Sequence, residues 1–286
     1  MNIQWYPGHM TKARRAMEED LKLVDLIIEL VDARIPRSSR NPDIHRLGKQ
    51  KKRLIILCKA DLADETACRR WKAYFEAEGC MALALDARKN ASKPVKDAIQ
   101  KCCKEKMARD RQRGILNRPL RVMVVGIPNV GKSTFINSLA GRAVTKTGNK
   151  PGVTRGNQWI RLSGSTELLD TPGILWPKFD DPMVGIRLAL TGSINDEILN
   201  ISELALEGIR LLQELYPDSL CLRYGEVENM TPAQVLEQIA TIRGCLKKGG
   251  VLDYDKAARL FLDELRSSKL GRFTLEWPEK KPAEEG

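Results

Sequence analysis

The segment VMVVGIPNVGKST, residues 122–134, constrains the fold of this chain more than any other part of the sequence. A short apolar run leads into Gly126, four residues follow, and Gly131, Lys132 and Ser133 then open the helix-forming stretch STFINSL. A glycine-rich turn between a strand and a helix is the context in which this spacing forms a phosphate-binding P-loop. Backbone N–H groups of such a loop face phosphates at the helix N-terminus, so the segment predicts a nucleotide site.

The residues of this loop have separate expected roles. Lys132 is expected to reach the β and γ phosphates as a catalytic residue, and Ser133 to bind Mg²⁺ as the cofactor. The residues expected to contact the nucleotide here are Asn129, Val130, Gly131, Lys132, Ser133 and Thr134.

A second motif, LLDTPG, follows the P-loop within the same α/β unit. Asp170 ends a predicted strand and can hold the Mg²⁺ shell, while Gly173 can offer its N–H to the γ phosphate. Asp-Thr-Pro-Gly is also a common turn, and its place downstream of the P-loop favours the phosphate role. Thr154, one of several threonines in the intervening loop, is expected to close on Mg²⁺ and the γ phosphate as a switch.

The stretch RLIILCKADLAD contains Cys58-Lys59-Ala60-Asp61, which is similar to the guanine-recognition box Asn-Lys-x-Asp with cysteine in place of asparagine. Asp61 can accept hydrogen bonds from guanine N1 and the 2-amino group, neither of which adenine offers. The stem of Lys59 can lie along the base. Asp86 and Ala87 follow the next predicted strand, where the Ala87 backbone can meet the guanine O6.

The chain has 286 residues and a formal net charge of +11, from 48 Lys and Arg against 37 Asp and Glu. This balance favours a polyanionic partner such as nucleic acid, although a soluble surface rich in lysine gives the same excess. Seven scattered cysteines and two histidines form no disulfide or metal-binding pattern. No apolar stretch reaches the roughly 18 residues of a membrane span, and no signal peptide is apparent, so a cytoplasmic protein is expected.

Short apolar runs that alternate with helical stretches predict βαβ units on a mostly parallel sheet, with helices on both faces. A helix is predicted from Met10 to Leu23, and a basic helix over 92–118. After about residue 195 the pattern becomes helical, and the helix that starts with a capping box at Thr231 and Gln234 is expected to end at Gly249-Gly250. The predicted organisation is an α/β GTPase domain over 1–195, including an N-terminal arm over 1–23, and a small all-helical domain over 196–286.

The order of these motifs places the guanine box before the P-loop, as in a circularly permuted Ras-like GTPase. The chain resembles the YlqF/RbgA family, ribosome biogenesis GTPase A. The resemblance rests on WYPGHM, LVDARIPRSSRNP, GIPNVGKSTFINSL, KPGVTRG and LLDTPGILWPK, in this order. It implies a GTPase that binds the large ribosomal subunit and its rRNA late in assembly, and whose hydrolysis of GTP licenses its own release.

Two residues depart from the family pattern. Cys58 stands where the family has asparagine, and Asp86 stands where serine usually precedes Ala87. Asparagine ties the guanine box to the P-loop, whereas a thiol is a poor hydrogen-bond donor. Weaker GTP and GDP binding is therefore expected, with Asp61 still selecting guanine.

The resemblance also suggests which residue orients the water that attacks the γ phosphate of GTP. Ile174 occupies the position of the water-orienting glutamine of Ras-like enzymes, and the family points to His9 as the catalytic substitute. A histidine after Pro-Gly is equally an ordinary turn or helix-start residue. Asn129 matches the asparagine that coordinates K⁺ in potassium-stimulated GTPases, or it caps its own turn.

Two surfaces are expected to contact RNA: the arm, through Lys12, Arg14 and Arg15, and the helical domain, through Arg243, Lys247 and Lys248. The basic 93–113 helix either contacts RNA or only balances the charge of the linker. The short connection from Gly173 to the helical domain lets the γ phosphate move that domain. A monomer is expected.

Other functions account for part of this sequence pattern. A GTP-dependent RNA-modifying enzyme needs a second chemical site, and the sequence contains none. A nucleotide-regulated scaffold with negligible hydrolysis, or another translation-associated permuted GTPase, shares the same motifs. An ATPase function would leave Asp61 with no role in recognising the base.

Overall fold

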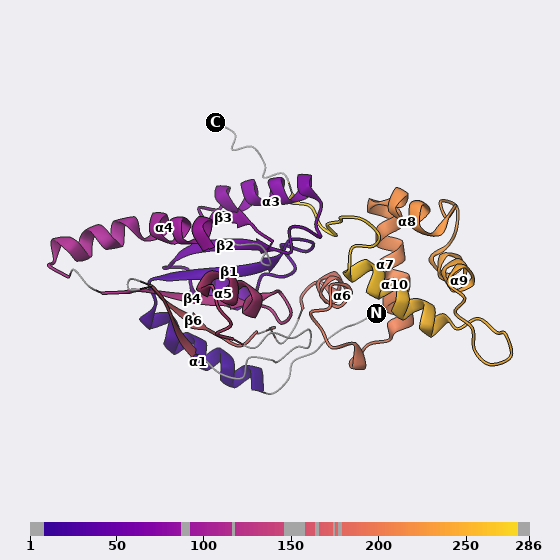
Figure 1. The fold of residues 1–286 in the computed structure, drawn as a ribbon, viewed down its shortest axis with the longest axis horizontal. Helices are drawn as coiled ribbons and strands as arrows, with labels where there is room; N and C mark the ends of the chain where they lie inside the picture. Colours follow the sequence, from indigo (N-terminus) through magenta and orange to yellow (C-terminus); the bar gives the residue numbers. More distant parts are fainter. Residues whose placement is uncertain are drawn as a thin grey trace.

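The computed structural model describes residues 9–86, 92–115, 118–145, 158–163, 166–173, 175–176 and 179–279. An α/β part built on a central sheet is followed by a helical part beside it (Figure 1). The strands are β1 Leu26–Asp32, β2 Lys52–Cys58, β3 Met81–Ala84, β4 Leu120–Gly126, β5 Gln158–Ser163 and β6 Thr166–Asp170. The α-helices are α1 His9–Leu23, α2 Pro42–Leu47, α3 Glu65–Ala77, α4 Ser92–Gln112, α5 Lys132–Ala140, α6 Pro182–Leu190, α7 Ile201–Leu215, α8 Pro217–Tyr224, α9 Pro232–Ile242 and α10 Tyr254–Arg266, with a 3₁₀ turn η1 at Asp196–Ile198.

The sheet has the strand order β3-β2-β1-β4-β6-β5, and only β5 runs antiparallel, against β6. The P-loop strand β4 is fourth in sequence but lies in the centre of the sheet, between β1 and β6. This confirms the predicted mostly parallel sheet and the permuted order of the GTPase elements. The predicted strand pair at QWIRL and TELLD is also confirmed, as β5 and β6.

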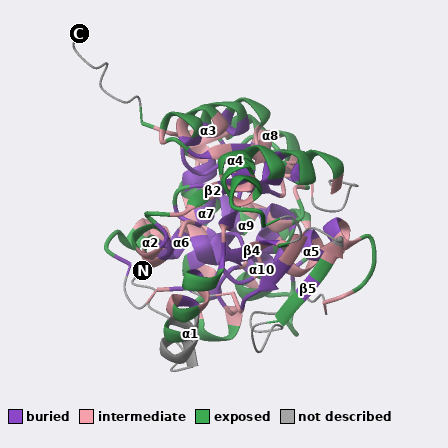
Figure 2. Cartoon of the chain, turned by 90° about the vertical axis from the view of Figure 1, so that its left-hand side faces the viewer, coloured by how far each residue is buried: buried purple, intermediate pink, exposed green. Residues whose placement is uncertain are grey.

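Helices cover both faces of the sheet, as predicted. In β2, Leu54 and Ile56 pack into the cluster that includes Ile99 of α4 and Phe135 of α5. Ile55 and Leu57 alternate with them and pack against α3. Because successive strand side chains point to opposite faces, α4 and α5 share one face and α3 covers the other. Figure 2 shows these buried strands enclosed by helices whose outer surfaces are exposed.

Two predicted helices end earlier than expected. The basic helix stops at Gln112 because Gly114 turns the chain with a φ of +74°. The helix that begins after Thr231 stops at Ile242, where Gly244 takes a φ of +60°, rather than at the later glycine pair. Its start is confirmed, since Thr231 and Gln234 form the reciprocal capping box. Among the described helices, none combines the length and apolarity that a membrane span needs.

In the helical part, α10 packs against α7 and α9, and its buried carboxylate, Glu264, pairs with side chains from the end of α8 and from just after α9. Arg223 donates to both of its oxygens, at 2.9 and 2.5 Å, and the Tyr224 hydroxyl donates at 2.8 Å. Arg243 lies 3.3 Å away. The hydrogen bonds from Arg223, followed by burial, which opposes them, set the pKa of Glu264 at about 2.

This depressed pKa predicts acid sensitivity. Ionised Glu264 stabilises the fold above its unfolded pKa of 4.5, and that stabilisation is lost as the pH falls from about 4.5 to about 2. Linkage gives roughly 3 kcal/mol. Glu264→Gln should therefore lose more unfolding free energy at pH 7 than at pH 3, measured by urea denaturation. Exposed Glu237→Gln is the matched control; an equal loss at both pH values in Glu264→Gln contradicts the prediction.

After α10 the chain returns to the α/β part (Figure 1). The Leu275 N–H donates to the Arg34 carbonyl at 2.8 Å, and Trp71 Nε1 donates to the Glu276 carbonyl at 2.9 Å. The Glu276 carboxylate accepts hydrogen bonds from the backbone and hydroxyl of Ser38. The segment 268–277 therefore ties the end of the helical part to the loop after β1 and to α3.

Candidate functional site

The candidate site lies at the carboxyl edge of the parallel strands. Asp32, Cys58, Gly126 and Asp170 each end a strand there. The registers pair Asp32 with Cys58, Leu30 with Gly126, and Val124 with Asp170, so these strand ends are aligned. From β1 the chain continues to β2 on one side, whereas β4 lies on the other. Ligands of open α/β sheets bind at the carboxyl ends of strands beside such a reversal.

The P-loop makes a tight turn between β4 and α5. Gly131 takes a φ of +104° and Asn129 a φ of +61°. An added Cβ at Gly126 would lie 2.9 Å from Val130 and 3.1 Å from the Leu30 carbonyl oxygen, so glycine is required there. Within the described residues no side chain caps the start of α5, and its first N–H groups remain directed at the loop. This geometry suits a phosphate group.

Lys132 and Asp170 form a buried ion pair across the P-loop. Lys132 Nζ donates to Asp170 Oδ1 at 2.5 Å, and their side chains are 7% and 1% exposed. Burial lowers the pKa of Lys132, and the neighbouring Asp170 opposes that shift. The ammonium is thus held at the loop, where a phosphate oxygen can replace the carboxylate as its partner.

The chemistry around Asp170 fits a magnesium ion. Asp170 Oδ2 is buried and has no hydrogen-bond partner among the described residues. A buried carboxylate oxygen without a partner is costly, and Mg²⁺ prefers oxygen ligands. Ser133, in the first turn of α5, offers a half-buried hydroxyl. Thr154, the third predicted ligand, lies outside the described residues.

Gly173 packs directly on the P-loop. A Cβ added there would lie 2.9 Å from both the N and Cα atoms of Pro128. Thr171, two residues earlier, donates from its hydroxyl to the Val124 carbonyl at 2.8 Å. The segment after β6 therefore runs against the turn that follows β4, as the predicted γ-phosphate role of Gly173 requires.

The guanine box follows β2. Cys58 is fully buried, and burial raises the pKa of its thiol to about 12, so it remains a neutral thiol. Asp61 lies half-buried in the next turn. The Leu85 N–H donates to the Leu57 carbonyl at 2.9 Å, and the Ala60 N–H to the Leu85 carbonyl at 3.4 Å. These bonds bring Asp86 beside the box, as predicted; Ala87 lies outside the described residues.

Lys59 has partners that the sequence pattern did not indicate. Its ammonium donates to Asp32 Oδ2 at 2.9 Å. Arg34 donates to the same carboxylate through Nε at 2.9 Å and Nη2 at 2.7 Å. Burial would raise the pKa of Asp32, but Arg34 and Lys59 hold it far below its usual range. The sequence does carry a signal for the Lys59–Asp32 contact. VDAR lies at the end of one predicted strand and CKAD at the end of the next, and the ends of neighbouring parallel strands lie side by side.

The other predicted residues are placed as follows. The Asn129 amide donates to the Gly192 carbonyl at 2.9 Å, and a cation would bind its other atom, the amide oxygen. His9 begins α1, but its side chain is outside the described part, as are those of Lys12 and Arg14. Arg15, Lys247 and Lys248 are exposed. Arg243 is largely engaged by Glu264 and stacks over Tyr224, so the expectation that it faces RNA is not supported.

Comparisons with known proteins agree with this geometry. The family model described as 50S ribosome-binding GTPase matches residues 121–219. Ribosome biogenesis GTPase A from Bacillus cereus is 49% identical over 98% of this chain and 95% of its own length. The protein of that name from Thermotoga maritima is 33% identical over 97% of this chain and 95% of its own.

Solved structures show the same architecture over almost the whole chain. A GDP-bound structure of TM YlqF has a TM-score of 0.70 at 27% identity, and covers 93% of this chain and 100% of that one. A GNP-bound YlqF from T. maritima has a TM-score of 0.65 at 29% identity, and covers 94% and 99%. The chain therefore belongs to the ribosome biogenesis GTPase A family.

Proposed function

We propose that this protein is a GTPase of ribosome assembly that acts as a monomer on the large ribosomal subunit at a late stage. The observation that carries the proposal is the alignment at one sheet edge of a buried Lys132–Asp170 pair, Gly173 against the P-loop, and the guanine box. The relatives that share nearly the whole chain are named for ribosome biogenesis.

The residues of the site have separate roles in GTP binding and hydrolysis. The N-terminus of α5 and Lys132 bind the phosphates and stabilise the charge that develops on them. The N–H of Gly173 orients the γ phosphate, while Asp61 selects the base. Ser133 and Asp170, with Thr154, would hold Mg²⁺, which neutralises phosphate charge when bound. The chain supplies no glutamine after Gly173, and His9 takes over the orientation of water.

Ribosome contact is proposed for two exposed basic regions. In the first region, Arg15 is exposed on the N-terminal helix α1. In the second, Lys247 and Lys248 are exposed on the turn closed by the Leu246–Leu252 bridge. With a net charge of +11, the chain should bind rRNA with an affinity that falls steeply as salt is raised. Binding there would place the helical part and the arm on the subunit, and GTP hydrolysis would release them.

GTP turnover with and without large-subunit precursors tests the proposal. We expect the precursors to increase turnover, and KCl to support a higher rate than NaCl if Asn129 coordinates K⁺.

His9→Ala should lose the stimulated rate but keep GDP binding, because His9 acts only on water. Equal turnover with and without precursor would leave a nucleotide-regulated scaffold. Equal rates in the two salts would remove the potassium site, and full stimulation of His9→Ala would remove that residue from the mechanism.

A further inference from the structure

The backbone of the guanine box is held in an unfavourable conformation at Lys59. Its φ of +56° is uncommon for a residue with a Cβ, and such a conformation persists only where its surroundings fix it. The Leu62 N–H closes the turn on the Lys59 carbonyl at 2.9 Å. The side chain ends on Asp32, so its direction is fixed at both ends.

Asp32 has no freedom to follow a moving lysine. Each carboxylate oxygen accepts two hydrogen bonds: Oδ1 from the Arg34 N–H and Nε, and Oδ2 from Arg34 Nη2 and Lys59 Nζ. Two lone pairs on each oxygen are thereby used. The carboxylate is fully buried, so a lost partner leaves it with an unsatisfied charge, which is costly.

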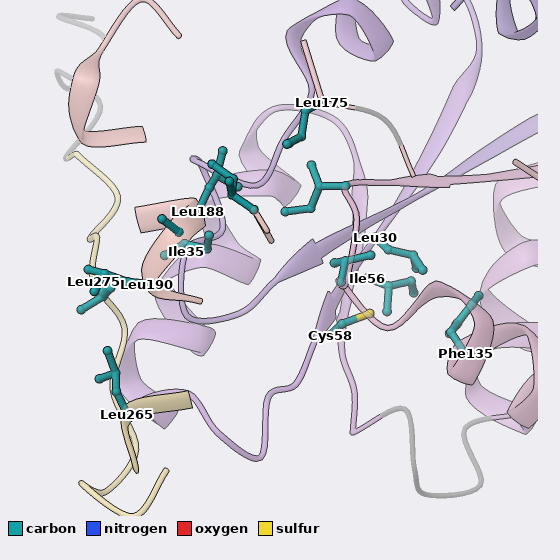
Figure 3. Packing of buried hydrophobic residues seen from close by; sticks show 14 of the residues in the cluster. Leu30, Ile35, Ile56, Cys58, Phe135, Leu175, Leu188, Leu190, Leu265 and Leu275 are labelled. Atoms are coloured by element: carbon teal, nitrogen blue, oxygen red, sulfur yellow. The ribbon is translucent and has the colours of Figure 1, made fainter. Parts of the chain in front are cut away.

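Arg34 in turn is anchored on the helical part. Its Nη1 donates to the Arg266 carbonyl and its Nη2 to the Thr191 carbonyl, both at 3.3 Å. Arg266 is the last residue of α10 and Thr191 caps α6, so the guanidinium meets two helix C-termini, where a cation is favoured. Figure 3 shows the apolar packing around this junction, with Ile35 beside Leu190.

We propose that Asp32 and Arg34 are positioning residues for guanine recognition. Arg34 fixes the carboxylate, the carboxylate fixes the ammonium of Lys59, and the stem of Lys59 is thereby laid along the base before the nucleotide arrives. Such preorganisation lowers the entropic cost of binding. It also gives the box a support that does not depend on the residue at position 58, where the thiol of Cys58 is a poor donor.

The proposal rests on the guanine site of the proposed function, and a double-mutant cycle tests it. Arg34→Lys keeps the charge but loses the two-pronged contact, and Lys59→Met keeps an apolar stem without the ammonium. Each should weaken binding of fluorescently labelled GDP about tenfold, and the double variant should lose little more, because both changes break one chain of contacts. The turnover number at saturating GTP should change less than KM.

Arg40→Lys is the matched control, because Arg40 is another largely buried arginine that pairs with carboxylates, Glu29 and Glu78. Its GDP affinity should stay close to that of the wild type. If Arg34→Lys does not fold, Asp32→Asn replaces it in the same cycle. Losses that multiply to about a hundredfold would overturn the positioning role and leave a general effect on stability. Failure of the wild type to bind GDP would instead overturn the guanine site itself.

Discussion

Asp61→Asn should weaken GDP binding by roughly 10²- to 10⁴-fold, because two hydrogen bonds to a charged acceptor contribute about 1.5–3 kcal/mol each. Guanine presents two donors, N1–H and the 2-amino group, to the carboxylate. An amide turns one of these acceptors into a donor and places it against a donor of the base. The N-terminus of α5 and Lys132 do not change, so the phosphates cannot compensate for the loss at the base.

Xanthosine diphosphate provides the internal control for this variant. Xanthine carries a carbonyl where guanine has the 2-amino group, so the amide of Asp61→Asn can donate to it and accept from N1–H. Calorimetry should show that the variant prefers xanthosine diphosphate to GDP, with the wild type showing the reverse. A variant that still prefers GDP would show that another residue reads the base.

Gly173→Ala should lower GTP turnover by at least about 10²-fold, as the loss of one aligned donor does in comparable sites. The added Cβ would lie 2.9 Å from the backbone of Pro128, closer than real contacts allow, so the segment after β6 or the P-loop must shift. Either shift moves the Gly173 N–H away from the γ phosphate. GDP lacks that phosphate, and its affinity should change much less than that for a GTP analogue.

Gly114→Ala separates this effect from the general cost of replacing glycine. Gly114 has a φ of +74°, beyond the end of α4, and no neighbouring atom lies within 4 Å of an added Cβ. Its replacement strains the backbone without touching the site, so turnover should remain at the wild-type rate. Equal losses of GDP and GTP-analogue affinity in Gly173→Ala would place the damage in the P-loop as a whole.

The sheet and the phosphate site could be predicted because their signals are local. A strand, a glycine turn and a helix follow one another within about a dozen residues around Lys132, and each has a mechanism that can be read from residue type. The strand ends at Cys58 and Asp170 could be brought together by topology alone. The roles assigned to His9, Thr154 and Ala87 stay predictions.

The contacts of Arg34 could not be predicted in the same way. Two of its partners lie at Thr191 and Arg266, and no periodicity or spacing in the sequence relates Arg34 to positions so far away. The Lys132–Asp170 ion pair cannot be read from the sequence either, because the motifs assign each residue to a ligand and not to the other residue. Local patterns identify which residues can do chemistry, whereas tertiary packing decides what each contacts without a ligand.

The return of the chain after α10 has a mechanical consequence. The helical part is joined to the α/β part by two connections, one before α6 and one through the segment around Leu275. The two parts also share direct contacts, because Arg34 donates to the Thr191 and Arg266 carbonyls and Asn129 donates to the Gly192 carbonyl. A movement of the helical part must therefore either break these hydrogen bonds or carry the P-loop and the loop after β1 along with it.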